Sequence, residues 1–105
     1  MNILIIGSAP SAIIANSWDL SIFNKIVAIN NAWKISPSWT NSIFPEDFPM
    51  ENRPVPNSNQ TVHSASEYVH AQNKFGGFVY AGGTMAFTAA YWSLHTFAPS
   101  TISYL

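Results

Sequence analysis

Small residues follow an apolar run near the start of the chain. Residues 3–6 are all apolar, and Gly7-Ser8-Ala9-Pro10-Ser11 comes directly after them. A nucleophile elbow needs a serine at the centre of Gly-x-Ser-x-Gly, but Ala9 stands at that centre. A Walker loop needs a lysine after its second glycine, and this stretch has none. Neither kind of site is therefore predicted here.

A dinucleotide-binding turn is a closer match to the same stretch. Gly7, Ala9 and Ala12 occupy the positions of Gly-x-Gly-x-x-Gly/Ala, after a predicted strand and before a predicted helix. Ala9 adds a methyl group where a glycine would let a pyrophosphate approach the backbone. NAD sites also place Asp or Glu after the second strand, whereas this chain has Asn30-Asn31. The NAD pattern is not met, and a tight strand-to-helix turn without a ligand stays open as the alternative.

Two other segments could complete a binding site. Asn30 and Asn31 end a second apolar run, and their amides can donate and accept hydrogen bonds, which suits a base edge or a sugar hydroxyl. Asparagine is also a common turn residue. The stretch 82–84, Gly-Gly-Thr, precedes a predicted helix whose free N–H groups favour an anion, the alternative being a turn with close helix packing. The predicted nucleotide-binding residues are Gly7, Ser8, Ala9, Pro10, Ser11, Asn30, Asn31, Gly82, Gly83 and Thr84.

The histidines and tryptophans carry a weaker signal. His63 stands at a predicted strand end, where a site residue could lie. Tryptophans are more typical of the core than of binding surfaces, although Trp33 follows the asparagine pair closely enough to reach a base.

The elements that must position these residues are predicted from apolar runs and turn signals. The apolar run at 3–6 and the strand candidate at 25–29, which is apolar after Lys25, are typical of parallel strands buried on both faces. Shorter strands are expected at 40–44, 61–62 and 101–105, and helices at 9–16, 64–74 and 84–97, separated in the middle by a proline-rich loop over 45–60. The pattern predicts a three-layer, Rossmann-like α/β fold with a mostly parallel sheet.

Composition limits the class of protein. The chain has 105 residues, enough for one domain over 1–105. A net charge of -1 with four scattered cations argues against nucleic acid as a partner, and the lack of cysteine excludes a thiolate nucleophile. No signal sequence or membrane span is evident, so we expect a cytoplasmic protein. Because only 9% of residues are charged, we expect apolar surface that favours a homo-oligomer.

The segments 5–11, 27–31 and 82–85 together resemble a known family. They are similar to the Rossmann-type glycosyltransferase-like proteins, which include bacterial CMP-sialic-acid-dependent sialyltransferases and motility-associated proteins related to a pterin diphosphokinase. The resemblance implies a nucleotide-sugar donor, such as a CMP-sugar, lying across residues 7–11. It places Asn30 or Asn31 near the ribose or base and residues 82–84 near the phosphate.

Two departures from the family pattern affect the catalytic assignment. Ala9 replaces the second glycine, and the chain ends at Leu105, where a Gly-x-Asp segment would begin. We therefore expect an N-terminal part of a longer protein, truncated at its C-terminus, whose general base lies in later sequence and whose catalytic residues are unknown. No metal and no resident cofactor is implied. The alternative is a noncatalytic module that binds a nucleotide or another anion, or an assembly domain.

Overall fold

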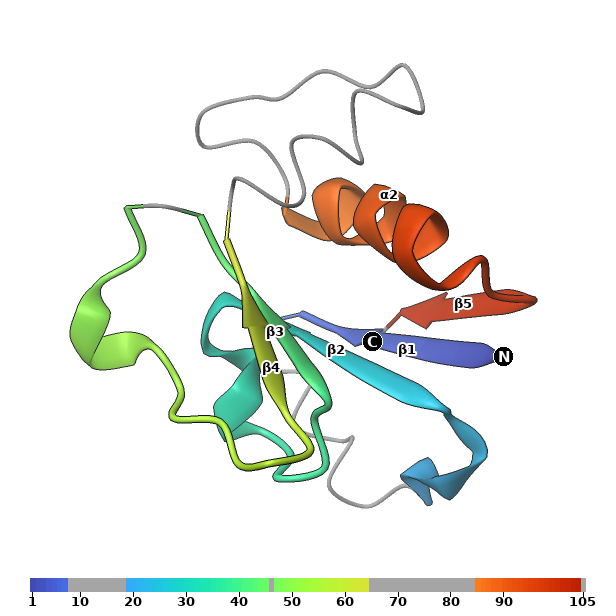
Figure 1. Ribbon diagram of the computed structural model, residues 1–105, viewed down its shortest axis with the longest axis horizontal. Helices are drawn as coiled ribbons and strands as arrows, with labels where there is room; N and C mark the ends of the chain where they lie inside the picture. Colours follow the sequence, from blue (N-terminus) through green and yellow to red (C-terminus); the bar gives the residue numbers. More distant parts are fainter. Residues whose placement is uncertain (8–18, 46, 65–84, 105) are drawn as a thin grey trace.

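Strands from across the whole chain form one parallel sheet. The computed structural model describes residues 1–7, 19–45, 47–64 and 85–104. The strands in these ranges are β1 (Asn2–Ile6), β2 (Lys25–Ile29), β3 (Asn41–Ile43), β4 (Thr61–His63) and β5 (Thr101–Tyr104). Their order is β4-β3-β2-β1-β5, and every neighbouring pair is parallel (Figure 1). The prediction of a parallel α/β sheet that includes the last strand is confirmed.

The interior position of β1 in the sheet explains why residues 3–6 are all apolar. β1 lies between β2 and β5, and its four apolar residues are each at most 1% exposed. Ile3 and Ile5 belong to the core on one face of the sheet, whereas Leu4 and Ile6 belong to the core on the other. A strand covered on both faces needs apolar side chains at successive positions, so the run is continuous rather than alternating.

A long helix covers one face of the sheet. Helix α2 (Met85–Phe97) packs against β1 and β2, and its Ala89 and Trp92 join the core that contains Ile3 and Ile5 (Figure 1). The helix ends at Ala98, whose φ is 45° and whose N–H donates to the Leu94 carbonyl at 3.2 Å. This left-handed residue stops the helix in an αL cap and directs the chain into β5.

Short 3₁₀ helices pack on the opposite face. The core there contains Leu4, Ile6, Ile26, Ala28, Ala32 and Trp39. Segments η2 (Leu20–Ile22) and η3 (Asn30–Lys34) supply side chains that cover it, among them Leu20 and Trp33. The helices predicted at 9–16 and 64–74 lie outside the described residues, so the described part shows a sheet with one long helix on one face and 3₁₀ segments on the other.

Asp19 caps η2. Its carboxylate accepts a hydrogen bond from the Ser21 hydroxyl at 2.7 Å and a second from the Ser21 backbone N–H at 3.0 Å. These two bonds, the hydroxyl bond first, hold the pKa of Asp19 below its ordinary value of 3.8 against a small opposing effect of burial. The cap satisfies an N–H group that the short helix would otherwise leave unpaired.

The strand order reverses beside β1. From β1 the chain moves outward through β2 and β3 to β4, and it then returns to the opposite side of β1 as β5. In open parallel sheets such a reversal opens a crevice at the carboxyl ends of the two strands involved, and ligands bind there. The residues that follow β1 and its neighbours are therefore the first candidates for a ligand-binding site.

Candidate functional site

Two of the predicted site residues lie together at the carboxyl edge of the sheet. Gly7 directly follows β1 and Asn30 directly follows β2. Because Ile6 pairs with Ala28, Gly7 is level with Ile29, one residue before Asn30. The structure thus brings Gly7 and Asn30 to one edge beside the strand reversal, and Gly7 is partly open to solvent there.

Asn30 has a strained backbone at this edge. Its φ is 53°, and Ala98 is the other non-glycine residue with a positive φ among those described. Asparagine tolerates the left-handed region better than most residues, because its short polar side chain can hydrogen-bond locally. The conformation turns the chain sharply out of β2 into η3, which begins at Asn30.

The side chain of Asn30 leaves a buried acceptor unused. Its Oδ1 is shielded from solvent and has no hydrogen-bond partner within the described residues. A buried carbonyl oxygen without a donor costs about 1–3 kcal/mol. An unsatisfied acceptor next to Gly7, at the edge where ligands bind in such sheets, is the strongest sign of a ligand among the predicted residues. Asn31, by contrast, is exposed.

The rest of the predicted site cannot be placed with these two. Ser8, Ala9, Pro10, Ser11, Gly82, Gly83 and Thr84 lie outside the described residues. Their convergence on one pocket with Gly7 and Asn30 stays a prediction.

His63 lies in a packed polar cluster. Its Nε2 is 3.0 Å from the amide nitrogen of Asn41, whose Oδ1 accepts from the Thr40 hydroxyl at 2.8 Å. The Asn41 amide and the His63 ring are therefore within hydrogen-bond distance of each other. The imidazole also packs on Trp92, with ring centroids 4.4 Å apart. These contacts give His63 a structural role that joins β3, β4 and α2.

Known proteins assign no family to this chain. No protein-family model matches it, and no curated protein or solved structure is significantly similar to it.

The described ranges lack two other features. They hold no group of three or more histidine, aspartate or glutamate side chains that could ligate a metal ion. None of the helices in these ranges has the length and apolar character that crossing a bilayer requires.

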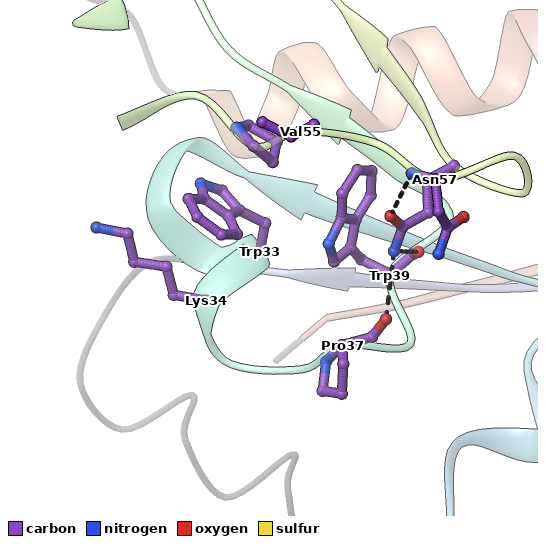
Figure 2. Close-up of a pocket in the computed structure, with 8 residues that line it drawn as sticks. Trp33, Lys34, Pro37, Trp39, Val55 and Asn57 are labelled. Carbon is purple, nitrogen blue, oxygen red and sulfur yellow. Dashed lines mark hydrogen bonds between the residues drawn. The ribbon is translucent and has the colours of Figure 1, made fainter. Parts of the chain in front are cut away.

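The structure also reveals a pocket that sequence reasoning missed. It has a volume of about 370 Å³ and lies between two segments of the chain (Figure 2). The first segment supplies Trp33, Lys34, Pro37 and Trp39. The second segment supplies Pro54, Val55, Asn57 and Gln60. Because Trp39 shortly precedes β3 and Gln60 directly precedes β4, the pocket extends toward the amino ends of these strands, away from Gly7.

Specific hydrogen bonds hold the two walls of this pocket together. The indole N–H of Trp33 donates to the Asn52 carbonyl at 2.8 Å. The Gln60 amide donates to the Pro37 carbonyl at 3.2 Å and to the Trp39 carbonyl at 3.0 Å. These bonds fix the proline-rich loop against η3. The sequence signal was this loop itself, whose length is unusual for a connection without function.

An arginine stiffens the same loop from within. Nε and Nη2 of Arg53 donate to the Phe48 carbonyl at 3.1 and 2.9 Å. The guanidinium also lies over the Phe44 ring, 4.8 Å from its centroid, and Phe44 stacks on Phe48. The loop is therefore ordered by its own side chains, which gives the pocket a fixed wall.

Proposed function

We propose that the chain is the nucleotide-binding part of a glycosyltransferase-like protein. The observation that carries the proposal is the unpartnered, buried Oδ1 of Asn30 beside Gly7, at the edge where the strand order reverses. An acceptor in this place suits a ribose hydroxyl or the amino group of a base, since both donate hydrogen bonds. The proposal includes the finer, three-layer Rossmann-like description of the fold.

Gly7 would contribute space rather than a functional group. A glycine directly after β1 lets a phosphate or ribose approach the main chain where a Cβ atom would stand. The segments 8–11 and 82–84 would then supply backbone N–H groups for the phosphate, as helix N-termini do in other nucleotide sites. Residues 7–11 would in this way lie under the donor.

Sugar transfer is a further step of the same proposal. The chain would hold the nucleotide-sugar donor, and a general base from elsewhere in the protein would take the proton of the acceptor hydroxyl as it attacks the anomeric carbon. The nucleotide would leave with the electron pair of the broken glycosidic bond. Binding without transfer, as in a noncatalytic module, remains the alternative outcome of the activity test.

Nuclear magnetic resonance titration tests the binding step. We expect CMP or UMP to shift the amide signals of Gly7 and Asn30 together, while signals from η2 stay in place. Asn30→Gly is the most informative variant, because glycine keeps the positive φ and removes the carboxamide. It should weaken binding by about five- to tenfold, the value of one hydrogen bond. Asn31→Gly is the matched control and should leave affinity unchanged, since Asn31 is exposed.

Two results would contradict the proposal. One is a titration in which neither Gly7 nor Asn30 responds to any nucleotide. The other is equal affinity of the Asn30→Gly and Asn31→Gly variants. Gly7→Val provides an independent check, because a branched side chain should fill the space and abolish the shifts in a protein that remains folded.

A further inference from the structure

We infer that the outer edge of β5 pairs with β5 of a second copy of this chain, so that the two sheets join into one. This inference is independent of the proposed nucleotide site. It rests on the backbone groups that β5 directs away from the sheet, on the symmetry of their arrangement and on the side chains beside them.

The outward backbone groups of β5 follow from its register. β5 pairs with β1 on one side, and none of the other described strands pairs with its second side (Figure 1). The Thr101 N–H donates to the Met1 carbonyl, so Thr101 directs its backbone groups toward β1. Because successive residues of a strand direct these groups to opposite sides, Ile102 and Tyr104 direct theirs outward. β5 therefore offers the N–H and C=O groups of both residues to a further strand.

The opposite edge of the sheet offers less to a partner strand. In β4, the Thr61 N–H donates to the Thr40 carbonyl at 3.0 Å. The His63 carbonyl accepts from the Phe44 N–H at 3.3 Å. Thr61 and His63 are thus directed toward β3, which leaves Val62 as the residue of β4 that is directed outward. A very short edge strand is one of the ways in which proteins protect a sheet edge, and β5 lacks this protection.

A second copy matches the edge of β5 because the outward groups are symmetric. When two β5 strands run antiparallel about a two-fold axis at Ser103, the backbone of Ile102 in each copy faces that of Tyr104 in the other. Each such pair exchanges both of its backbone hydrogen bonds, so no outward group of β5 is left unpaired. The axis is perpendicular to the sheet, and both copies of α2 therefore lie on the same face of the joined sheet.

The side chains near the axis permit this pairing. Residues 101–104 contain no charge and no proline, although natural sheet edges are commonly protected by such residues. Ser103 is exposed. In the antiparallel pair it would face its own copy at a Cα separation of about 4.5 Å, where a small side chain fits well. A charged strand from another protein would find no opposite charge on β5, whereas an identical strand matches it group for group.

β5 is held in place before a partner arrives. The Thr101 hydroxyl donates to Asn2 Oδ1 at 2.8 Å. The Ser100 N–H donates to the Met1 carbonyl at 2.9 Å. The edge is thus ordered in a single copy and loses little entropy on pairing. Because the paired segment is short, we expect a weak dimer with a Kd of about 0.1–1 mM.

A single cysteine tests the position of the axis, because the chain contains no cysteine of its own. Ser103→Cys places two thiols across the axis, at a Cα separation of about 4.5 Å that a disulfide can span. Mild oxidation of the full chain should therefore cross-link two copies. Thr101→Cys is the matched control, since it lies on the same strand and the same face. Its two copies are four residues apart along the strand, about 13 Å, so it should cross-link more slowly by about tenfold or more.

Hydrogen exchange and sedimentation provide a second test. Raising the concentration from micromolar to millimolar should slow the exchange of the Ile102 and Tyr104 N–H groups, which become hydrogen-bonded in the dimer. The Val62 N–H on the opposite edge should not change. Ser103→Lys places two ammonium groups across the axis, so sedimentation should show about fivefold weaker association. Ser58→Lys, at an exposed site before β4, is the charge control and should leave association unchanged.

Several outcomes would overturn the inference. One is a chain that stays monomeric at millimolar concentration, and another is an equal cross-linking rate for the two cysteine variants. Slow exchange of Ile102 and Tyr104 in the monomer would show that another part of the same chain covers this edge. Dimerisation that slows the exchange of Val62 instead would assign the contact to β4. Dimerisation through β5 without nucleotide binding would leave this inference standing and refute only the proposed function.

Discussion

Replacing Ala98 by glycine should stabilise the protein. Ala98 has a φ of 45°, where the Cβ atom of an L-residue clashes with the backbone and destabilises the fold. Because the residue is exposed, its methyl group adds little stability through burial. The clash costs about 1–2 kcal/mol for an L-residue relative to glycine. Glycine also loses more backbone entropy on folding than alanine, which reduces the gain in stability by about 0.4–1 kcal/mol. The net gain in the free energy of unfolding should be about 0.5–1 kcal/mol, with the αL cap at Leu94 retained.

Thermal unfolding followed by circular dichroism measures this gain. For a domain of this size, it corresponds to a rise in Tm of about 2–8 °C. Ala90→Gly is the matched control, since it makes the same chemical change inside α2, where the backbone is helical. It should lower the free energy of unfolding by about 1 kcal/mol, because glycine is a poor helix former. A fall in Tm for Ala98→Gly, or the same sign for both variants, would refute the reasoning.

Two further perturbations test individual hydrogen bonds. Thr40→Val keeps the shape of the side chain but removes the hydroxyl that accepts from the Ile26 N–H at 2.9 Å, so the midpoint of urea unfolding should fall by an amount equivalent to about 1–3 kcal/mol, with the m-value unchanged. A change in the m-value instead would point to altered compactness. Ser21→Ala removes the hydroxyl bond to Asp19, so the pKa of Asp19 should rise toward 3.8 in a carboxyl titration by NMR, while Ser58→Ala, at an exposed site, should not move it. Since the folded-state pKa is lowered, the stability from this bond is present above pH 3.8 and is lost as the pH falls through the folded-state value.

The long apolar runs allowed much of the sheet to be predicted. The apolar residues at 3–6 and 26–29 predicted β1 and β2, and the parallel pairing of these strands is confirmed. The bounds of the short strands were less accurate, because β3 contains Asn41 and Ser42, which have low strand propensity. These residues are extended because they pair with β2 on one side and β4 on the other, and such pairing is not visible in a local window of sequence.

In the candidate sites too, some features could be predicted from the sequence and others depend on contacts in space. Gly7 and Asn30 were predicted to share an edge because the carboxyl ends of parallel strands always do. The left-handed backbone of Asn30 and the shielding of its Oδ1 depend on what surrounds them in space, so no sequence pattern encodes them. The pocket beside Trp39 was missed for a related reason. Its walls meet only because Trp33 bonds to Asn52 and Gln60 bonds back to Pro37, across connections that carry no motif.

The position of β1 between β2 and β5 affects how the chain folds during synthesis. β1 is synthesised before β5, which is one of its two partner strands, and the hydroxyl of Thr101 donates to Asn2 Oδ1 across 99 residues. At the usual rates of translation, that separation corresponds to about 5–20 s in which one side of the most apolar strand has no partner. A nascent chain in this state exposes a hydrophobic strand edge, which is a template for aggregation. Yield in the cell should therefore depend on the supply of chaperones during this interval more than on the stability of the finished fold.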